Sequence, residues 1–294
     1  MKNYLKLMRV EQWVKNLFVF VPLFFSGQIL NLHLFSLSCV AFIIFSLTAS
    51  SIYIINDYMD IASDRKHPEK KHRPLASGAI SKTSAKVLLG VLMLCVLVGI
   101  SSGFYAQIGT MFQFATIILT YFVMNLAYTF KLKHIAIIDI TIIAIGFVLR
   151  VLAGGYITGL IITQWAILLT FVLALVLAIG KRRGELINAQ LTGKTRKALD
   201  GYNIQFADIT LSLSCTLAIV CYLMFTLSPE VQERFHPRVF YTVIFVMFAF
   251  LRYLQQTLVY NKTESPTKIV YKDRYIQVTL VLWLVAFLYQ IYAK

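Results

Sequence analysis

Long apolar runs separated by short polar connections dominate the chain. A helix needs roughly 17–25 mostly apolar residues to cross the hydrocarbon core of a bilayer. Nine runs reach that length, at residues 14–31, 34–55, 84–103, 110–130, 135–156, 163–181, 206–228, 239–260 and 276–293. The pattern therefore predicts an all-α membrane protein with nine transmembrane helices, in which residues 1–294 form one integral membrane domain.

Composition supports this class of protein and excludes another. The chain is 59% hydrophobic and 14% charged, whereas a soluble protein carries about 25% charged residues. A net charge of +15 would suit a nucleic-acid partner, but such binding needs a basic face on a soluble domain. The chain offers no such domain, so we expect no nucleic acid among its partners.

The basic residues alternate between the two sides of the predicted membrane. Nearly all of the 28 lysines and arginines lie before the first span or in every second connection. The exceptions are Arg150 and Arg252 within spans and Arg234, Arg238 and Lys294 in the other connections and the tail. Cytoplasmic loops are enriched in Lys and Arg. We therefore expect a multi-pass protein of the cell membrane with a cytoplasmic N-terminus and an external C-terminus.

One acidic motif follows the second run. If the helix of residues 34–55 continues, Asn56, Asp60 and Asp64 are spaced by four residues and share a face with Asp57. Like charges at this spacing destabilise a helix unless something neutralises them. Mg²⁺ accepts oxygen ligands and is usually held by one or two carboxylates plus substrate phosphates. The motif thus predicts a metal site on the cytoplasmic side; a solvated acidic helix end is the simpler alternative.

Basic and polar residues flank this motif. Arg65 and Arg73 lie in the next connection, and arginine binds phosphate in a bidentate manner, so both are predicted phosphate ligands. Lys15 and Asn16 lie where the first apolar run begins. Lys15 could simply extend to the membrane interface, whereas Asn16 is expected to face the interior of the bundle.

Charged residues also occur inside the fifth run. Asp139 and Arg150 are eleven residues apart, about three helical turns, and so share a helix face. Charged residues within spans normally face a partner or a wet cavity. Asp139 is therefore a candidate site residue, with a structural ion pair as the alternative.

The connection after the sixth run is strongly basic. It contains Lys181, Arg182 and Arg196, with Glu185 and Asp200 embedded among them. Such a cluster could bind a multiply phosphorylated ligand, with a carboxylate left for a second metal or a sugar hydroxyl. No Ser/His/Asp or Cys/His arrangement is present that would indicate a covalent nucleophile. Together with a Mg²⁺ site, this pattern indicates an enzyme that handles a diphosphate near the lipid.

The motifs resemble those of a known superfamily. Asn56-Asp57-x-x-Asp60-x-x-x-Asp64 after a second span is similar to the first aspartate-rich motif of UbiA-type membrane prenyltransferases. The segment from Tyr128 through Lys131 and Lys133 also resembles that superfamily. This implies a nine-helix UbiA-type bundle with a cytoplasm-facing central cavity. The usual second Asp-x-x-x-Asp motif is absent, and Gly180-Lys181-Arg182-x-x-Glu185 stands in its place.

The resemblance is closer to the decaprenyl-phosphate phosphoribosyltransferase branch. It extends over nearly the whole chain through Gln12-Trp13-x-Lys15-Asn16, Arg73-Pro74-x-Ala76-x-Gly78, Gly146-Phe147-x-Leu149-Arg150 and Leu199-Asp200-x-Tyr202. The resemblance implies Mg²⁺-dependent transfer of 5-phosphoribose from 5-phosphoribosyl 1-diphosphate to a polyprenyl phosphate lipid. The alternatives are a conventional prenyltransferase with an aromatic or other small acceptor, a transporter, and a membrane scaffold. The oligomeric state stays open, a homo-oligomer included.

The resemblance also implies a role for each group of candidate residues. Mg²⁺ and the diphosphate would be held by Asn56, Asp57, Asp60 and Asp64. Phosphates would be bound by Lys131, Lys133, Lys181 and Arg182, and a donor or acceptor phosphate by Lys15 and Asn16. Ribose hydroxyls or a second metal would fall to Glu185, Asp200 or Asp139, and Tyr128, Arg196 and Tyr202 complete the substrate-binding set.

Overall fold

The computed structural model describes residues 2–66, 70–106, 109–192, 197–235, 237–261, 269 and 272–292. These residues form helices and connections, with no strand among them. Arg196, one of the predicted substrate-binding residues, lies outside the described residues. The chain divides into two compact units, the first made of Met1–Phe130 and Leu149–Ile161 and the second of Lys131–Val148 and Ile162–Lys294.

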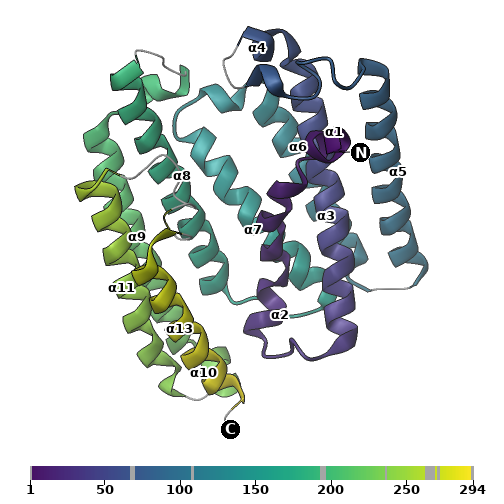
Figure 1. The fold of residues 1–294 in the computed structure, drawn as a ribbon. Helices are drawn as coiled ribbons and strands as arrows, with labels where there is room; N and C mark the ends of the chain where they lie inside the picture. The colour runs from purple at the N-terminus through teal and green to yellow at the C-terminus, as the bar shows by residue number, and fades with distance from the viewer. Residues whose placement is uncertain are drawn as a thin grey trace. The chain divides into compact units, whose positions relative to one another are not determined.

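The first unit is built around one long helix, α3 (Leu32–Met59). Figure 1 shows α3 between α5 and the N-terminal segment. The unit also contains the second half of α7 (Ile138–Thr158). Its other elements are α1 (Lys2–Met8), the 3-10 helix η1 (Val10–Phe20), α2 (Val21–Phe25), α4 (Ile61–Lys66), η2 (Lys70–His72), α5 (Lys82–Tyr105) and α6 (Met111–Phe130).

The second unit is a layer of long antiparallel helices. The second unit contains the first half of α7. In this unit α8 packs against α9, and α11 packs against α13. Its elements are η3 (Leu132–His134), α8 (Gln164–Thr192), η4 (Lys197–Gly201), α9 (Ile204–Leu227), α10 (Pro229–Arg234), η5 (Pro237–Thr242), α11 (Val243–Leu254), the π-helix η6 (Gln255–Val259) and α13 (Arg274–Tyr292). Buried residues such as Val176, Leu211 and Tyr253 form its core.

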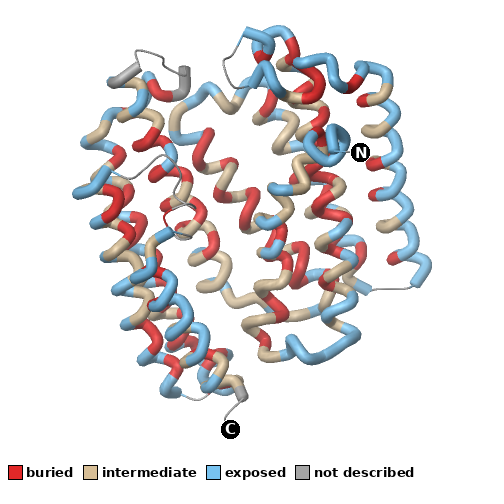
Figure 2. Tube along the Cα trace, in the orientation of Figure 1, coloured by how far each residue is buried: buried red, intermediate tan, exposed pale blue. Residues whose placement is uncertain are grey.

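Exposed apolar side chains mark a surface that faces lipid. Val87, Val91, Leu94 and Val98 follow one another along α5 at helical spacing, and all four are exposed. Figure 2 shows α5 as largely exposed, with only scattered buried positions. Large exposed apolar stripes are unfavourable in water. Eight helices in the described part of the chain are long and apolar enough to cross a membrane, as expected for a multi-pass membrane protein.

The prediction of an all-helical membrane fold is confirmed, but the count of nine spans is not. Eight predicted runs coincide with the eight candidate spans. The predicted span at residues 14–31 instead forms η1 followed by α2, which ends before Gly27, a residue with positive φ. Pro22 lies in the first turn of α2, where a proline is tolerated because its missing N–H would have no partner within the helix. Because a 3-10 helix rises about 2.0 Å per residue, η1 and α2 together still extend roughly 30 Å.

The length of an apolar run does not predict that the run forms a 3-10 helix. The segment has the hydrophobicity of a span, and hydrophobicity does not distinguish a 3-10 helix from an α-helix. The tight path of η1 is matched by a glycine on α7. A Cβ added at Gly154 would lie only 1.8 Å from the backbone oxygen of Val19, so the glycine allows α7 to approach η1 closely.

The close approach at Gly154 predicts an asymmetric pair of variants. Gly154→Ala should lower the free energy of unfolding by about 1–3 kcal/mol, because the new methyl group meets backbone rather than a flexible side chain. Gly90→Ala on α5, where nothing lies within 4 Å of the added Cβ, should raise it by about 0.5–1 kcal/mol. Thermal unfolding of both variants in detergent measures this, and equal melting temperatures would contradict the close approach.

Candidate active site

The acidic motif lies where α3 ends and α4 begins. Asp60 follows the last residue of α3 with non-helical φ of −90° and ψ of 5°. Its backbone N–H donates to the oxygen of Asn56 at 3.0 Å, and that of Asp64 donates to the oxygen of Asp60 at 2.8 Å. The helical path therefore continues across the motif with a break at Asp60. Asp57 and Asp64 are buried, whereas Asn56 and Asp60 are half-buried.

Two arginines neutralise the buried carboxylates. One nitrogen of Arg73, Nη1, lies 3.1 Å from Oδ1 of Asp57 and 2.8 Å from Oδ2 of Asp64. Nη2 of Arg9 lies 2.5 Å from the same Oδ1 of Asp57. The two carboxylates and two guanidinium groups have no net formal charge. Buried charges are tolerated when they are paired and hydrogen-bonded in this way.

The loop that carries Arg73 is held by its own hydrogen bonds. The backbone N–H of Arg73 donates to the oxygen of Lys70 at 2.9 Å, and that of Ser77 donates to the oxygen of Arg73 at 2.9 Å. Nε of Arg65 donates to the backbone oxygen of Ala76 at 3.1 Å. Arg65 thus braces the loop, while the side chain of Arg73 reaches back to the motif.

The N-terminal segment is hydrogen-bonded to a row of polar residues on one face of α3. Ser46, Ser50, Tyr53 and Asp57 are spaced by three or four residues and so lie on one face of the helix. Ser50 Oγ donates to the backbone oxygen of Met8 at 2.8 Å and accepts from Trp13 Nε1 at 3.0 Å. These hydrogen bonds fix the start of η1 against α3.

Arg9 is a site residue that the sequence did not single out. It adopts a left-handed conformation, with φ of 51° and ψ of 49°, which is costly for a residue with a side chain. This turn between α1 and η1 directs its guanidinium over the ring of Tyr53, 4.8 Å from the centroid, and onto Asp57. The available signal was the polar stripe from Ser46 to Asp57, which needed a hydrogen-bond donor at its Asp57 end.

Asn16 and Arg150 meet deeper in the first unit. Arg150 Nε donates to Oδ1 of Asn16 at 2.8 Å and its Nη2 donates to Tyr121 at 3.1 Å. Asn16 Nδ2 donates to Ser46 Oγ at 2.9 Å. Both predictions of inward-facing residues are therefore confirmed, but in this structure they form a buried polar cross-link between η1, α3, α6 and α7. Lys15, beside Asn16, is half-buried.

The second unit has its own buried ion pair. Oδ2 of Asp139 lies 2.7 Å from Nε of Arg182, and both residues are almost completely buried. Nη1 of Arg182 also lies 2.5 Å from Oε2 of Glu185, and Lys181 lies 4.0 Å from the other oxygen of Glu185. Lys181, Arg182 and Glu185 from the basic connection thus join Asp139 from the fifth run in one cluster, which we call the Asp139 cluster.

Tyr202 completes the Asp139 cluster. Its hydroxyl donates to Oδ1 of Asp139 at 2.8 Å and accepts the backbone N–H of Ile137 at 2.7 Å. Burial, joined by the hydrogen bond to Asp139, raises the pKa of Tyr202 above its usual value. The hydroxyl therefore remains a donor at neutral pH. It also holds Ile137, which has a positive φ of 69°, at the start of α7.

Four further predicted residues are Tyr128, Lys131, Lys133 and Asp200. Tyr128 is half-buried near the end of α6, in the first unit. Lys131 is exposed and Lys133 half-buried, at the start of the second unit. Asp200 is exposed in η4. The substrate-binding roles of these four residues stay predictions.

The second unit contains further ion pairs that were not predicted from the sequence. Arg183, buried beside Arg182, contacts Asp208 at 2.5 Å and Asn261 at 3.1 Å. Arg252 contacts Asp273 at 2.9 Å. Burial alone would raise the pKa of Asp273, but the hydrogen bond and charge of Arg252 together with backbone hydrogen bonds lower it overall. These pairs join α8 to α9 and α11 to the start of α13, which indicates a structural role.

The donor set of the acidic motif fits a divalent cation in combination with a phosphate ligand. Within the described residues, no group of three or more His, Cys, Asp or Glu side chains is arranged as a metal site. Two buried carboxylate oxygens nevertheless converge on the cationic Nη1 of Arg73. A pair of carboxylates is the share of ligands that proteins usually give to Mg²⁺ when substrate phosphates supply the rest.

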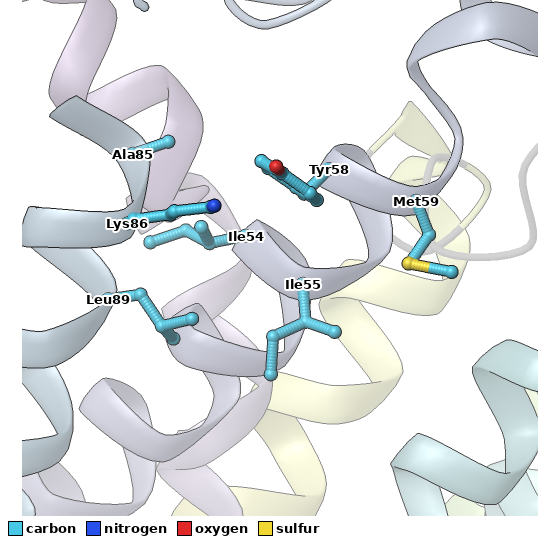
Figure 3. A pocket seen from close by; sticks show the side chains of 7 residues that line it. All are labelled: Ile54, Ile55, Tyr58, Met59, Ala85, Lys86 and Leu89. Atoms are coloured by element: carbon cyan, nitrogen blue, oxygen red, sulfur yellow. The ribbon is translucent and has the colours of Figure 1, made fainter. Parts of the chain in front are cut away.

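An apolar pocket of about 180 Å³ lies between α3 and α5. Ile54, Ile55, Tyr58, Met59, Ala85, Lys86 and Leu89 line it (Figure 3). The amine of Lys86 lies 5.5 Å from the centre of the Tyr58 ring. The carboxylates of the motif are not among the lining residues, so this pocket is distinct from the paired acids.

Several relatives of the chain carry the same name. The chain is 35% identical over 292 residues to the decaprenyl-phosphate phosphoribosyltransferase of Mycolicibacterium smegmatis, and the match covers 95% of this chain and 89% of the relative. The enzymes of that name from Corynebacterium glutamicum and Mycobacterium tuberculosis H37Rv are 30% and 31% identical. They cover 98% and 95% of this chain, and 86% and 91% of their own lengths.

Solved structures agree in fold. A UbiA homologue from Archaeoglobus fulgidus bound to DMAPP and Mg²⁺ matches with a TM-score of 0.69 at 18% identity, covering 99% of this chain and 100% of the other. A digeranylgeranylglyceryl phosphate synthase matches with a TM-score of 0.66 at 19% identity, covering 100% and 99%. The UbiA prenyltransferase family model matches residues 17–272. The chain therefore belongs to the UbiA prenyltransferase family and is a membrane-embedded transferase.

Proposed function

We propose that this transferase moves 5-phosphoribose from 5-phosphoribosyl 1-diphosphate to a polyprenyl phosphate, with Mg²⁺ as cofactor. The observation that carries the proposal is the pair of buried carboxylates, Asp57 and Asp64, that converge on Arg73. Such a site can hold a Mg²⁺–diphosphate group while arginines lie within reach of its phosphates. The names of the relatives, over almost the entire chain, support this donor and acceptor class.

The proposed reaction requires no proton transfer to or from a side chain of the protein. The bond between ribose C1 and the diphosphate oxygen breaks, and its electron pair leaves with diphosphate. An oxygen of the polyprenyl phosphate forms the new bond to C1. That oxygen is already anionic at neutral pH, so no general base is required. As in other glycosyl transfers, the transition state should resemble an oxocarbenium ion.

The residues of the first unit would hold the leaving group. Bound Mg²⁺ would stabilise the negative charge that develops on the diphosphate. Asn56, Asp57, Asp60 and Asp64 supply oxygen ligands in the proposal. Arg73 would meet phosphate oxygens. Lys15 and Asn16 are assigned to the acceptor or donor phosphate.

The candidate residues of the second unit are assigned to phosphates and ribose hydroxyls. Lys131, Lys133, Lys181 and Arg182 are the proposed phosphate ligands, and Glu185 or Asp200 the proposed partners of the ribose hydroxyls. Both oxygens of Asp139 already accept hydrogen bonds, from Arg182 and Tyr202. We therefore assign Asp139 and Tyr202 to positioning Arg182. We further propose that residues 1–294 act as one catalytic domain with a cytoplasmic active site.

Conventional prenyl transfer is the second candidate. It is favoured by the fold shared with a homologue whose structure contains DMAPP and Mg²⁺. In this chain, however, the C-terminal part of α8 presents a buried Arg182 with Glu185 in place of a second Asp-x-x-x-Asp motif. A multiply phosphorylated donor suits this extra positive charge better than a prenyl diphosphate.

A product assay on the purified protein distinguishes the two functions. With Mg²⁺, a polyprenyl phosphate and labelled 5-phosphoribosyl 1-diphosphate, we expect a labelled lipid that enters chloroform and that disappears when EDTA is added. The same protein should form no product from a prenyl diphosphate and an aromatic acceptor. The opposite pattern would replace the proposed function with conventional prenyl transfer.

Asp60 offers the cleanest test of the acidic motif, because it is half-buried whereas Asp57 and Asp64 are buried. Asp60→Asn should lower kcat at least about 100-fold, since loss of a metal ligand costs more than loss of an outer-shell partner. The free energy of unfolding should change by less than about 1 kcal/mol. Glu230→Gln, an exposed acid on α10, is the control and should retain activity. Normal turnover by Asp60→Asn would remove Asp60 from the site.

Tyr202→Phe tests the positioning role of the Asp139 cluster. It leaves one oxygen of Asp139 and the N–H of Ile137 without this partner, at a cost of about 1–3 kcal/mol in unfolding free energy. We expect a higher KM for 5-phosphoribosyl 1-diphosphate and an unchanged KM for the lipid. Tyr105→Phe, at a tyrosine that is 92% exposed, should change neither quantity. A variant with lower stability but unaltered KM would reduce the cluster to a structural role.

A further inference from the structure

The arginines of the acidic motif occupy the oxygens that a metal ion would need. Oδ1 of Asp57 accepts from both Arg9 and Arg73, and Oδ2 of Asp64 accepts from Arg73. A divalent cation binds carboxylate oxygens at about 2.0–2.1 Å. A cation that took these two oxygens as ligands would displace the guanidinium groups from them, because like charges repel strongly at such short distances.

Charge leads to the same conclusion. The two buried carboxylates and two guanidiniums are neutral together, so a metal ion added beside them would bring two uncompensated positive charges into a buried region. Such an excess is unfavourable at low dielectric. A diphosphate removes it, because its negative charge compensates for both the metal and the displaced arginines.

Both arginines are able to move. The side chain of Arg73 is 27% exposed and that of Arg9 is 22% exposed. The side chains of Asp64 and Asp57 are nearly inaccessible, at 4% and 2%. The backbone of Arg73 is held in its turn by Lys70 and Ser77, and that of Arg9 by Ser50 through its neighbour Met8. Each guanidinium can therefore leave the carboxylate and stay within reach of a phosphate bound beside it.

We propose that Arg73 and Arg9 are exchangeable counter-ions of the acidic motif. They hold Asp57 and Asp64 until substrate arrives, and they pass to the phosphate oxygens when a metal ion takes the carboxylates. Metal and diphosphate therefore bind cooperatively, and the metal alone binds weakly. This inference rests on the proposed metal-binding function of the motif, and it adds a role for Arg9 that the sequence did not suggest.

The experiment measures Mn²⁺ binding by electron paramagnetic resonance on the full chain in detergent, with and without inorganic diphosphate. For the unaltered protein, we expect diphosphate to tighten Mn²⁺ binding, and by reciprocity Mn²⁺ to tighten diphosphate binding. Arg73→Gln removes a competitor for two carboxylates. It should tighten the binding of Mn²⁺ alone about tenfold, since charge-assisted hydrogen bonds contribute about 1.5–3 kcal/mol, and it should reduce the effect of diphosphate.

Matched variants separate this effect from simple loss of charge. Lys71→Gln removes one positive charge from an exposed position in the same loop, and it should leave Mn²⁺ binding within about twofold of the unaltered value. Arg9→Gln removes the other counter-ion and should act like Arg73→Gln, which keeps the test decisive if either variant fails to fold. Asp64→Asn should weaken Mn²⁺ binding in every background and so locate the ion at the motif.

The outcomes are distinguishable from failure of the proposed function. If Mn²⁺ binds with equal affinity to the unaltered protein, Arg73→Gln and Arg9→Gln, the counter-ion exchange is wrong while the metal site stands. Weaker Mn²⁺ binding in both arginine variants would likewise overturn the exchange. If no Mn²⁺ binds with or without diphosphate, the metal site itself is wrong.

Discussion

The cost of an unpaired polar group in an apolar environment governs this structure. A chain that is 59% hydrophobic can bury its few polar side chains only where each finds a partner, because an unsatisfied group costs several kcal/mol in hydrocarbon. Pairing therefore decides which helices meet. Asn16 joins η1 to α3 through Ser46 and to α7 through Arg150, and Arg183 joins α8 to α9 through Asp208.

The same rule explains how much of the fold the sequence could reveal. Apolar length predicted eight spans correctly because a long lipid-facing helix needs no more than that property. It failed at residues 14–31, where polar contacts rather than lipid set the path of the chain. Trp13 and Asn16 bond to Ser50 and Ser46 along one face of α3, and η1 follows that face as a 3-10 helix.

The acidic motif was predictable for a different reason, and only in part. Its spacing is local, so Asp57 and Asp64 could be recognised from the sequence, and Arg73 lies near enough in the chain to be suspected. Arg9 is separated from Asp57 by 48 residues and depends on a left-handed turn, for which no local signal exists. A spacing rule finds the members of one helix face, whereas the counter-ions of that face come from elsewhere in the fold.

The basic residues in the C-terminal part of α8 show that charge in a sequence says little until the partner of each charged side chain is known. Lys181, Arg182 and Arg183 look alike in the sequence, as a cluster suited to phosphate. In the structure Lys181 is 59% exposed, while Arg182 and Arg183 are only 2% and 4% exposed and are paired with Asp139 and Asp208. Those partners lie 43 and 25 residues away, beyond what periodicity can detect.

Burial also separates two uses of the same kind of ion pair. Arg182 is surrounded by protein and bonded to Asp139 and Glu185, so releasing it would leave a buried charge uncompensated, at about 3–5 kcal/mol. Arg73 is bonded to two carboxylates as well, but its side chain borders water, which lowers the cost of release. Asp139 can therefore hold the guanidinium of Arg182 in one position, whereas Arg73 can leave its carboxylates for each substrate. The difference lies in access to solvent, since the participating residue types are the same.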